Sequence, residues 1–134
     1  MALLESGEMY LETILILSGR ISPVRAIDVC DYIGYSKPSV SRAMRLLRTG
    51  GYILVDTNGA ITLTDSGRAI AERIYERHQT LTTLLVGLGV DEKTATEDAC
   101  KMEHYLSDET YAAFKEHAKL YGSKQYDYSE KSND

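Results

Sequence analysis

Residues 36–63 read SKPSVSRAMRLLRTGGYILVDTNGAITL, and this stretch decides the fold. Ser36 is a suitable helix N-cap, and Pro38 near the first turn gives up a backbone donor that would be unpaired there anyway. The pair Gly50-Gly51 predicts the end of this helix. Three apolar residues recur at helical spacing and predict its buried stripe, namely Val40, Met44 and Leu47.

Two short β-rich runs follow this helix, at residues 52–55 and 60–63. Asn58-Gly59 stands between them. Asn-Gly between β-rich runs is a strong hairpin signal, because tight primed turns need positive φ angles. The sequence therefore predicts a two-stranded hairpin directly after the helix.

The residues before the stretch predict two more helices. Residues 1–18 form the first, which Gly19 ends, and residues 25–33 form the second. Gly34 is suited to a left-handed C-terminal cap, where it has no Cβ to clash. Two helices joined by a short turn and followed by a hairpin predict a winged helix-turn-helix.

Only helices are expected after the hairpin. Thr64 or Asp65 would cap a fourth helix, which Gly87 ends; Asp91 would cap a fifth, running to about Leu106. Ser107 would cap a sixth, whose apolar stripe is Tyr111, Phe114, Ala118 and Tyr121. The predicted fold class is mainly α. A winged helix-turn-helix domain with a two-stranded wing (residues 1–72) precedes an all-helical domain (73–121) and a disordered tail (122–134).

Charge is distributed unevenly along the chain. The net charge is −5, yet residues 35–55 carry four bases and no acid, while residues 76–134 carry 7 bases and 12 acids. A basic stretch within an acidic chain suits local contact with phosphates. Two cysteines are too few for a disulfide framework, and neither a signal peptide nor a membrane-spanning apolar run is visible. We therefore expect a soluble, cytoplasmic protein.

The third helix is the expected DNA-binding element. In a helix-turn-helix, the N-terminal residues of the second helix reach base edges in the major groove. Arginine and lysine can donate to guanine or phosphate, and a proline can touch a thymine methyl. The alternative is a winged helix used for protein contact. The candidate DNA-binding residues are Ser36, Lys37, Pro38, Ser39, Ser41, Arg42 and Arg45.

A second group of residues suggests a metal site. Cys100, Glu103 and His104 stand at i, i+3 and i+4, so a helix would present a sulfur, a carboxylate and an imidazole on one face. His78 lies on the apolar face of the fourth helix, where an imidazole needs a partner. Each residue also has a simpler interpretation, because a buried cysteine often acts as a small hydrophobe and a core histidine often has one hydrogen bond.

The order and spacing of five segments resemble the diphtheria-toxin-repressor family of iron- and manganese-dependent regulators, which includes the manganese-transport regulators. The resemblance covers about residues 5–120. It rests on Glu8-Met9-Tyr10-Leu11-Glu12, on Ser36-Lys37-Pro38-Ser39-Val40-Ser41, on Leu63-Thr64-Asp65-Ser66-Gly67, on Arg77-His78, and on residues 98–107, which read DACKMEHYLS.

The resemblance implies a mixed set of metal ligands. Met9 and Cys100 match ligands of the iron-type members, and Glu12 matches a ligand of the manganese type. His78, Glu103 and His104 match ligands of both types. Thioether and thiolate ligands favour Fe, Co, Ni or Zn over Mn. We therefore expect Fe(II) as the favoured ion and Mn(II) as a second possibility, with Zn, Co or Ni able to bind in vitro.

The sequence departs from the iron type in two respects. Thr82 and Thr96 stand where the resemblance would place ancillary-site ligands, so we do not expect an ancillary site of that type. A second ion could instead be held by Glu12 and His78, with Glu103 shared. The SH3-like third domain of the longer iron-type members has no counterpart, so the chain resembles a short form.

The resemblance implies a homodimeric, metal-dependent repressor of metal-homeostasis genes that binds a palindromic operator in double-stranded DNA. Bound metal would act as co-repressor and fix the DNA-binding domains. One alternative is a winged-helix regulator that senses a small organic ligand, with a purely structural Cys-Glu-His face. Metal-assisted hydrolysis is a poorer match, because no nucleophile, base pair or phosphate loop accompanies the ligands. We therefore do not expect an enzyme.

Overall fold

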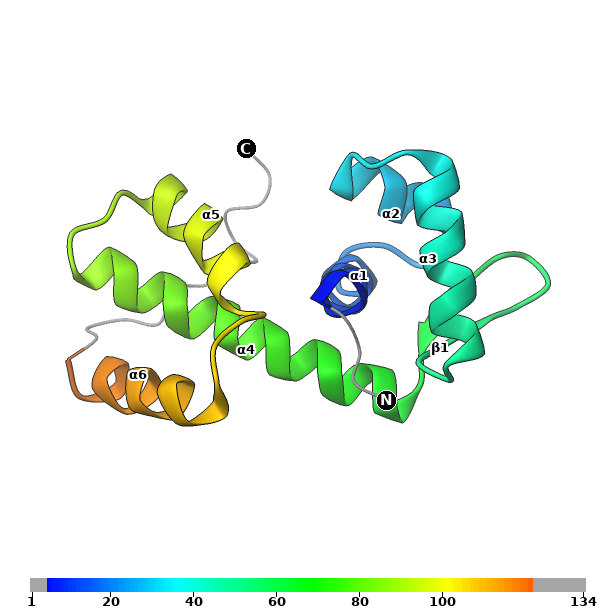
Figure 1. Cartoon of the computed structure of the whole chain (residues 1–134). Coiled ribbons are helices and arrows are strands. Elements are labelled where there is room, and N and C mark those ends of the chain that lie inside the picture. The colour runs from blue at the N-terminus through cyan, green and yellow to red at the C-terminus, as the bar shows by residue number, and fades with distance from the viewer. Residues whose placement is uncertain (1–4, 122–134) are drawn as a thin grey trace. The chain divides into compact units, whose positions relative to one another are not determined.

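A computed structural model describes residues 5–121, and it confirms a mainly α fold with a two-stranded antiparallel sheet. The elements are α1 (Glu5–Ser18), α2 (Ala26–Ile33), α3 (Lys37–Thr49), β1 (Ile53–Val55), β2 (Ile61–Leu63), α4 (Asp65–Gly87), α5 (Glu92–Met102) and α6 (Asp108–Tyr121) (Figure 1). The predicted tail at 122–134, and the predicted start of the first helix at 1–4, lie outside the described residues.

The chain divides into two compact units after Arg73, whereas the sequence placed the boundary after residue 72. The first unit holds α1, α2, α3, the hairpin and the start of α4. The second holds the rest of α4 together with α5 and α6. Within residues 5–121, no helix is both long enough and apolar enough to cross a membrane.

The first unit is built around an apolar core shared by its helices and the hairpin. The predicted stripe of α3 is buried in this core. Fully burying one such aliphatic side chain contributes about 1.5 to 3 kcal/mol. The core therefore fixes which face of α3 points outward. Its buried members include Leu11, Ile14, Val29, Val40, Met44, Leu47, Ile53 and Ile61.

Local signals set both ends of the turn between α2 and α3. Gly34 adopts φ 82° and donates its N–H to the carbonyl of Cys30 at 2.8 Å, which ends α2 as predicted. Ser36 caps α3, because its Oγ accepts from the backbone N–H of Ser39 at 3.3 Å. Three residues, 34 to 36, therefore separate the two helices.

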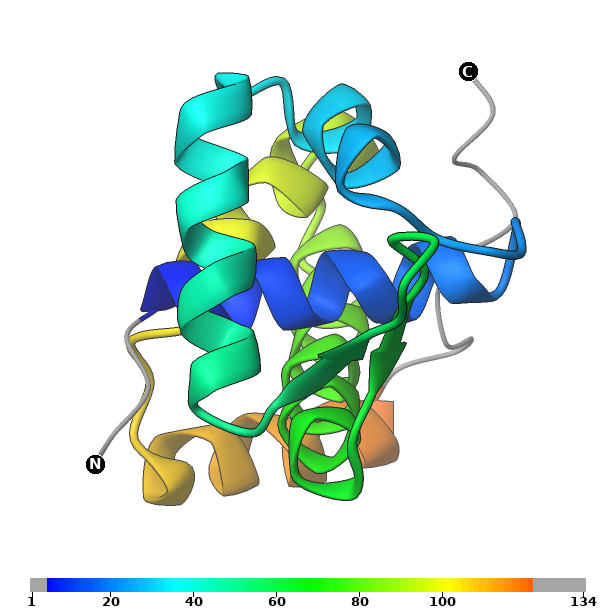
Figure 2. The same cartoon turned by 90° about the vertical axis from the view of Figure 1, so that its right-hand side faces the viewer.

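The hairpin forms as predicted, but its turn differs. β1 and β2 pair antiparallel with Leu54 opposite Thr62, and Figure 2 shows the two strands beside α3. Gly59 has φ 82°, whereas Asn58 does not have a positive φ, so the predicted primed turn is wrong. Asp56 accepts from the N–H of Gly59 at 3.0 Å through its carbonyl, and from the N–H groups of Asn58 and Ala60 through its carboxylate. These bonds stabilise a three-residue loop with one left-handed glycine.

The start of α4 packs directly against the wing. Thr64 is the cap, because its Oγ1 accepts from the N–H of Gly67 at 3.2 Å while it donates to the carbonyl of Gly51 at 2.7 Å. A Cβ on Gly67 would lie 2.0 Å from the carbonyl oxygen of Tyr52. Only glycine lets the helix approach the backbone just before β1 this closely.

In the second unit, α5 and α6 lie on opposite sides of α4 (Figure 1). Asp91 caps α5 through the N–H of Thr94, and Ser107 caps α6 through the N–H of Thr110. The interface between these helices buries Ile74, Leu81, Ala95 and Ala99. On α6, the predicted apolar residues Tyr111, Phe114 and Ala118 are half-buried.

The predicted end of the fifth helix at about Leu106 is wrong, since α5 ends at Met102. Glu103 keeps a helical backbone conformation and donates its N–H to Ala99, but the following residues form a turn. The carbonyls of Glu103 and Leu106 accept hydrogen bonds from Arg77 of α4 instead of from a further helical turn. This exchange of partners allows the chain to reverse direction before α6.

Candidate metal centre and DNA-binding surface

His78 of α4 is the buried starting point of the candidate metal centre. It is 1% exposed and shares the inner face of α4 with Ile74 and Leu81. Its Nδ1 lies 2.9 Å from Oε2 of Glu103. A histidine on an apolar face needs such a partner, because an unpaired imidazole is costly to bury.

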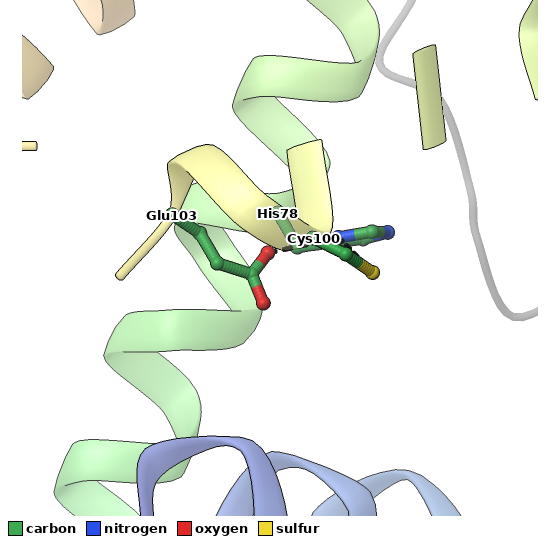
Figure 3. A group of neighbouring side chains, drawn as sticks. All are labelled: His78, Cys100 and Glu103. Carbon is green, nitrogen blue, oxygen red and sulfur yellow. Dashed lines mark hydrogen bonds and ion pairs between the residues drawn. The ribbon is translucent and has the colours of Figure 1, made fainter. Parts of the chain in front are cut away.

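Cys100 and Glu103 approach His78 from the end of α5. Sγ of Cys100 lies 3.8 Å from Nδ1 of His78. One donor atom from each of the three residues lies within 4.8 Å of the other two (Figure 3). Glu103 is 1% exposed, whereas Cys100 is open to solvent. The cluster is therefore deep on its carboxylate side and accessible on its sulfur side.

His104 lies next to this cluster in the turn after α5. Its Nε2 is 3.4 Å from Oε1 of Glu103, while Oε2 of the same carboxylate faces His78. The two oxygens of one carboxylate therefore face two different imidazoles. The other three predicted second-unit ligands thus lie around Glu103, although α5 ends before Glu103 and His104.

The donor set fits a transition-metal ion. Bonds of about 2.0 to 2.3 Å from a metal to nitrogen, oxygen and sulfur place two ligand atoms on one ion up to about 4.5 Å apart. The observed spacing, within 4.8 Å, is close to that limit. Imidazole, thiolate and carboxylate together are typical ligands of Fe, Co, Ni and Zn. Small side-chain rotations would bring the three atoms onto one ion.

The other two predicted ligands, Met9 and Glu12, lie on α1 in the first unit. Glu12 is buried and Met9 is half-buried. Oη of Tyr35 approaches Sδ of Met9 at 4.0 Å, and the rings of Tyr35 and Tyr10 form a T-shaped pair with centroids 6.4 Å apart. Burial, assisted by Tyr35, raises the pKa of Tyr10, so this phenol stays neutral. Met9 is thus in contact with the turn that leads into α3.

No role was predicted for Arg77, which lies beside the centre. Arg77 is 3% exposed, and its guanidinium donates to the carbonyls of Glu103 and Leu106. It directly precedes His78 in α4. The available signal was a charged residue within a buried helical stripe. Its partners could not be predicted, because they lie in a turn that we predicted to be helical.

The seven predicted DNA-binding residues are all exposed, at the N-cap and on the outer face of α3. Ser36 uses its hydroxyl as the helix cap and also bonds Ser39 at 2.9 Å. The side chains of Lys37, Arg42 and Arg45 extend from a helix whose opposite face is buried. Near the wing tip, Nε of Arg25 donates to the carbonyl of Asn58 at 3.1 Å, which ties the wing to the start of α2.

Several proteins are similar to this chain. An uncharacterised helix-turn-helix transcriptional regulator of Methanocaldococcus jannaschii is 37% identical over 107 residues, which is 78% of this chain and 86% of the relative. The transcriptional regulator MntR of Escherichia coli O6:H1 is 34% identical over 86% of this chain and 74% of its own length. The diphtheria toxin repressor of Corynebacterium diphtheriae is 30% identical over 80% of this chain, but only 48% of that repressor is covered.

A solved structure and two family models agree with these relatives. A manganese-dependent transcriptional repressor in complex with manganese superimposes with a TM-score of 0.78 at 31% identity, covering 85% of this chain and 53% of that one. Residues 2–61 match the iron-dependent repressor N-terminal DNA-binding domain, and residues 64–119 match the iron-dependent repressor metal-binding and dimerisation domain. The resemblance found in the sequence is confirmed: the chain belongs to the iron-dependent repressor family of transcription regulators.

Proposed function

We propose that this protein is a homodimeric repressor that binds operator DNA when a divalent transition-metal ion occupies the site around Glu103. The observation that carries the proposal is the convergence of His78, Cys100 and Glu103, whose donor atoms lie within 4.8 Å of one another. An exposed basic helix face in the same chain supports DNA as the partner. Membership of a family of transcription regulators supports a regulatory and not a catalytic role.

The proposed ligands come from both units. Met9 and Glu12 belong to the first unit, which carries α3, and His78, Cys100, Glu103 and His104 belong to the second. A bound divalent ion supplies the positive charge that holds carboxylate, thiolate and imidazole together. Ligation from both units would restrict the position of α3 relative to the second unit. Without it, fewer dimers are competent for DNA binding, and the apparent affinity for DNA falls by that fraction.

A homodimer explains how two α3 helices would bind one site. A palindromic operator presents half-sites one helical turn, about 34 Å, apart on one face of the duplex. The family match in residues 64–119 includes dimerisation. The half-buried apolar residues of α6, Tyr111, Phe114 and Ala118, are available for such an interface. We place the protein in the cytoplasm, acting on metal-homeostasis genes.

Ligand chemistry favours Fe(II) as the physiological ion. The sulfur atoms of Met9 and Cys100 are softer donors than manganese prefers, whereas the carboxylates of Glu12 and Glu103 keep Mn(II) as the second choice. Zinc, cobalt and nickel would bind in vitro, because affinities follow the Irving–Williams order whichever ion serves in the cell.

Fluorescence anisotropy on a labelled palindromic operator tests this function. Metal-stripped protein is titrated alone, with Fe(II) under anaerobic conditions, and with Mn(II). We expect metal to raise DNA affinity tenfold or more, which corresponds to about 1.4 kcal/mol of coupling. Operator DNA should tighten metal binding by the same factor, because the linkage is reciprocal.

The matched variants are Glu103→Gln and Glu97→Gln, which make the same change at the end of α5 and at an exposed position within it. Only Glu103→Gln should abolish the effect of metal. If metal-stripped protein binds the operator as tightly as loaded protein, the metal is not a co-repressor. A regulator that responds to a small organic ligand would then be the better assignment.

A further inference from the structure

Arg77 is a buried arginine with partners on two sides. Its side chain is 4% exposed, and Nη1 donates to the carbonyl of Leu106 at 2.8 Å and to that of Glu103 at 3.4 Å. Nη2 pairs with the carboxylate of Asp108 at the start of α6. A buried cation persists only where it is paired and hydrogen-bonded. The partners satisfy Nη1 and Nη2, whereas the buried Nε has no hydrogen-bond partner among the residues that the structure describes.

The carbonyls that Arg77 binds belong to the turn that carries two proposed ligands. Residues 103–107 connect α5 to α6, and Glu103 and His104 are the first two of them. Beyond the end of a helix, backbone carbonyls lack intrahelical partners. Arginine can satisfy two of them at once because its donors form a rigid planar fork. The guanidinium thus sets the backbone path from which both ligand side chains extend.

On its other side, Arg77 contacts α6. Its guanidinium carbon lies 4.8 Å from the centre of the Tyr111 ring, in a cation–π arrangement. The hydroxyl of Tyr111 lies 3.1 Å from Oγ1 of Thr80, one turn along α4. Burial raises the pKa of Tyr111, so the phenol stays neutral under the cation. Arg77 is therefore held between the turn and α6.

We propose that Arg77 is a positioning residue for the metal centre: it holds the backbone of the turn so that Glu103 faces His78 and Cys100, and His104 faces Glu103. It is not itself a ligand, because a guanidinium has no lone pair to offer a metal. His78 and Arg77 are neighbours in α4. His78 supplies one metal ligand, and Arg77 fixes the turn that supplies two further ligands, Glu103 and His104. This role rests on the proposed metal-dependent function.

The test compares Arg77→Met with Arg68→Met in the full chain. Both substitutions remove an arginine from α4, but Arg68 is half-exposed and approaches only Glu72 among the charged groups that the structure describes. Metal affinity is measured by calorimetric titration with Co(II) under anaerobic conditions. We expect Arg77→Met to weaken binding about 10- to 100-fold, the range for residues that orient metal ligands, and Arg68→Met to bind as the unmodified chain does.

The Co(II) absorption spectrum separates positioning from general loss of stability. Cys100 lies within α5, before the turn, so its sulfur-to-cobalt charge-transfer band should persist in Arg77→Met. The visible d–d bands should change, because Glu103 and His104 would no longer be held in place. A variant that is merely less stable would show the unmodified spectrum once it is folded and saturated with Co(II).

If Arg77→Met does not fold, Arg77→Lys tests the positioning role instead. Lysine keeps the charge but lacks the planar fork that reaches both carbonyls. We expect at least a tenfold weaker affinity and altered d–d bands. Unmodified affinity and spectrum in a folded Arg77 variant would overturn the positioning role alone. If the unmodified chain itself binds no Co(II), the proposed metal-dependent function is what fails.

Discussion

At the scale of single residues, the most demanding position is Gly67, where α4 touches the wing. Gly67→Ala would place a Cβ 2.0 Å from the carbonyl oxygen of Tyr52. Both sides of this contact are backbone, so neither can rotate away. We expect the free energy of unfolding to fall by about 3 kcal/mol, the upper part of the usual range for overpacking. Urea denaturation followed by circular dichroism measures this change.

Gly87→Ala is the matched control, since the same helix gains the same methyl group. A Cβ there would meet nothing within 4 Å. Alanine favours a helix over glycine by up to about 1 kcal/mol, so this variant should be as stable as the unmodified chain or slightly more so. Equal stabilities for the two variants would show that Gly67 is not constrained by Tyr52.

Two buried threonines of α4 differ in their hydrogen bonding. Oγ1 of Thr80 bonds the hydroxyl of Tyr111, whereas Oγ1 of Thr82 has no hydrogen-bond partner among the residues that the structure describes. Valine has the same shape without the hydroxyl. Thr80→Val should cost about 1 kcal/mol, while Thr82→Val should be neutral or stabilising by a similar amount. Thermal unfolding of both variants at one pH would show the opposite signs.

At the scale of elements, the exposed face of α3 carries most of the predicted DNA-binding residues. Arg42→Ala should cost about 1 to 3 kcal/mol of operator affinity and relax specificity at the base it contacts. Arg68→Ala, at an exposed position of α4, should leave affinity unchanged. Anisotropy titrations on matched and single-mismatch operators at several salt concentrations measure both effects. An Arg42→Ala protein with unchanged affinity and salt dependence would remove this face of α3 from the DNA interface.

The sequence predicted α3 well because its signals are local. Ser36 and Pro38 mark the start, and the buried stripe needs only helical periodicity. The turn of the wing was less predictable, because Asn58-Gly59 is compatible with more than one loop. The carboxylate of Asp56, which binds two amides of that loop, decided between them. That preference comes from Asp56, two residues before Asn58, and not from the Asn-Gly pair alone.

Around the candidate metal site, the limit of prediction was the end of α5. Periodicity continues through Leu106, so nothing local indicates that the helix stops at Met102. The stop is stabilised from α4 by Arg77, a contact between residues far apart in the sequence. Even so, the one-turn spacing of Cys100 and Glu103 was preserved, because Glu103 retains helical backbone angles. The ligand set itself remains a prediction from the resemblance.

At the scale of the whole molecule, the proposal predicts that one ion affects both units. Hydrogen exchange read by mass spectrometry should slow on Mn(II) binding in residues 8–14 of α1 as well as in residues 99–106. The reason is that ligation opposes local opening wherever a ligand is held. Protection confined to 99–106 would show that Met9 and Glu12 are not ligands. The variant Glu12→Gln should reduce the protection in α1.

The continuity of α4 limits how the sequence of this helix can vary. Gly67 and His78 are eleven residues apart in one uninterrupted helix. At 3.6 residues per turn, that separation is close to three full turns, so the two positions emerge on the same side of the helix. Replacing a residue between them by any residue other than proline preserves this phase, whereas adding or removing one would rotate His78 by about 100° relative to Gly67. Natural variation in this segment should therefore consist of substitutions, with its length kept constant.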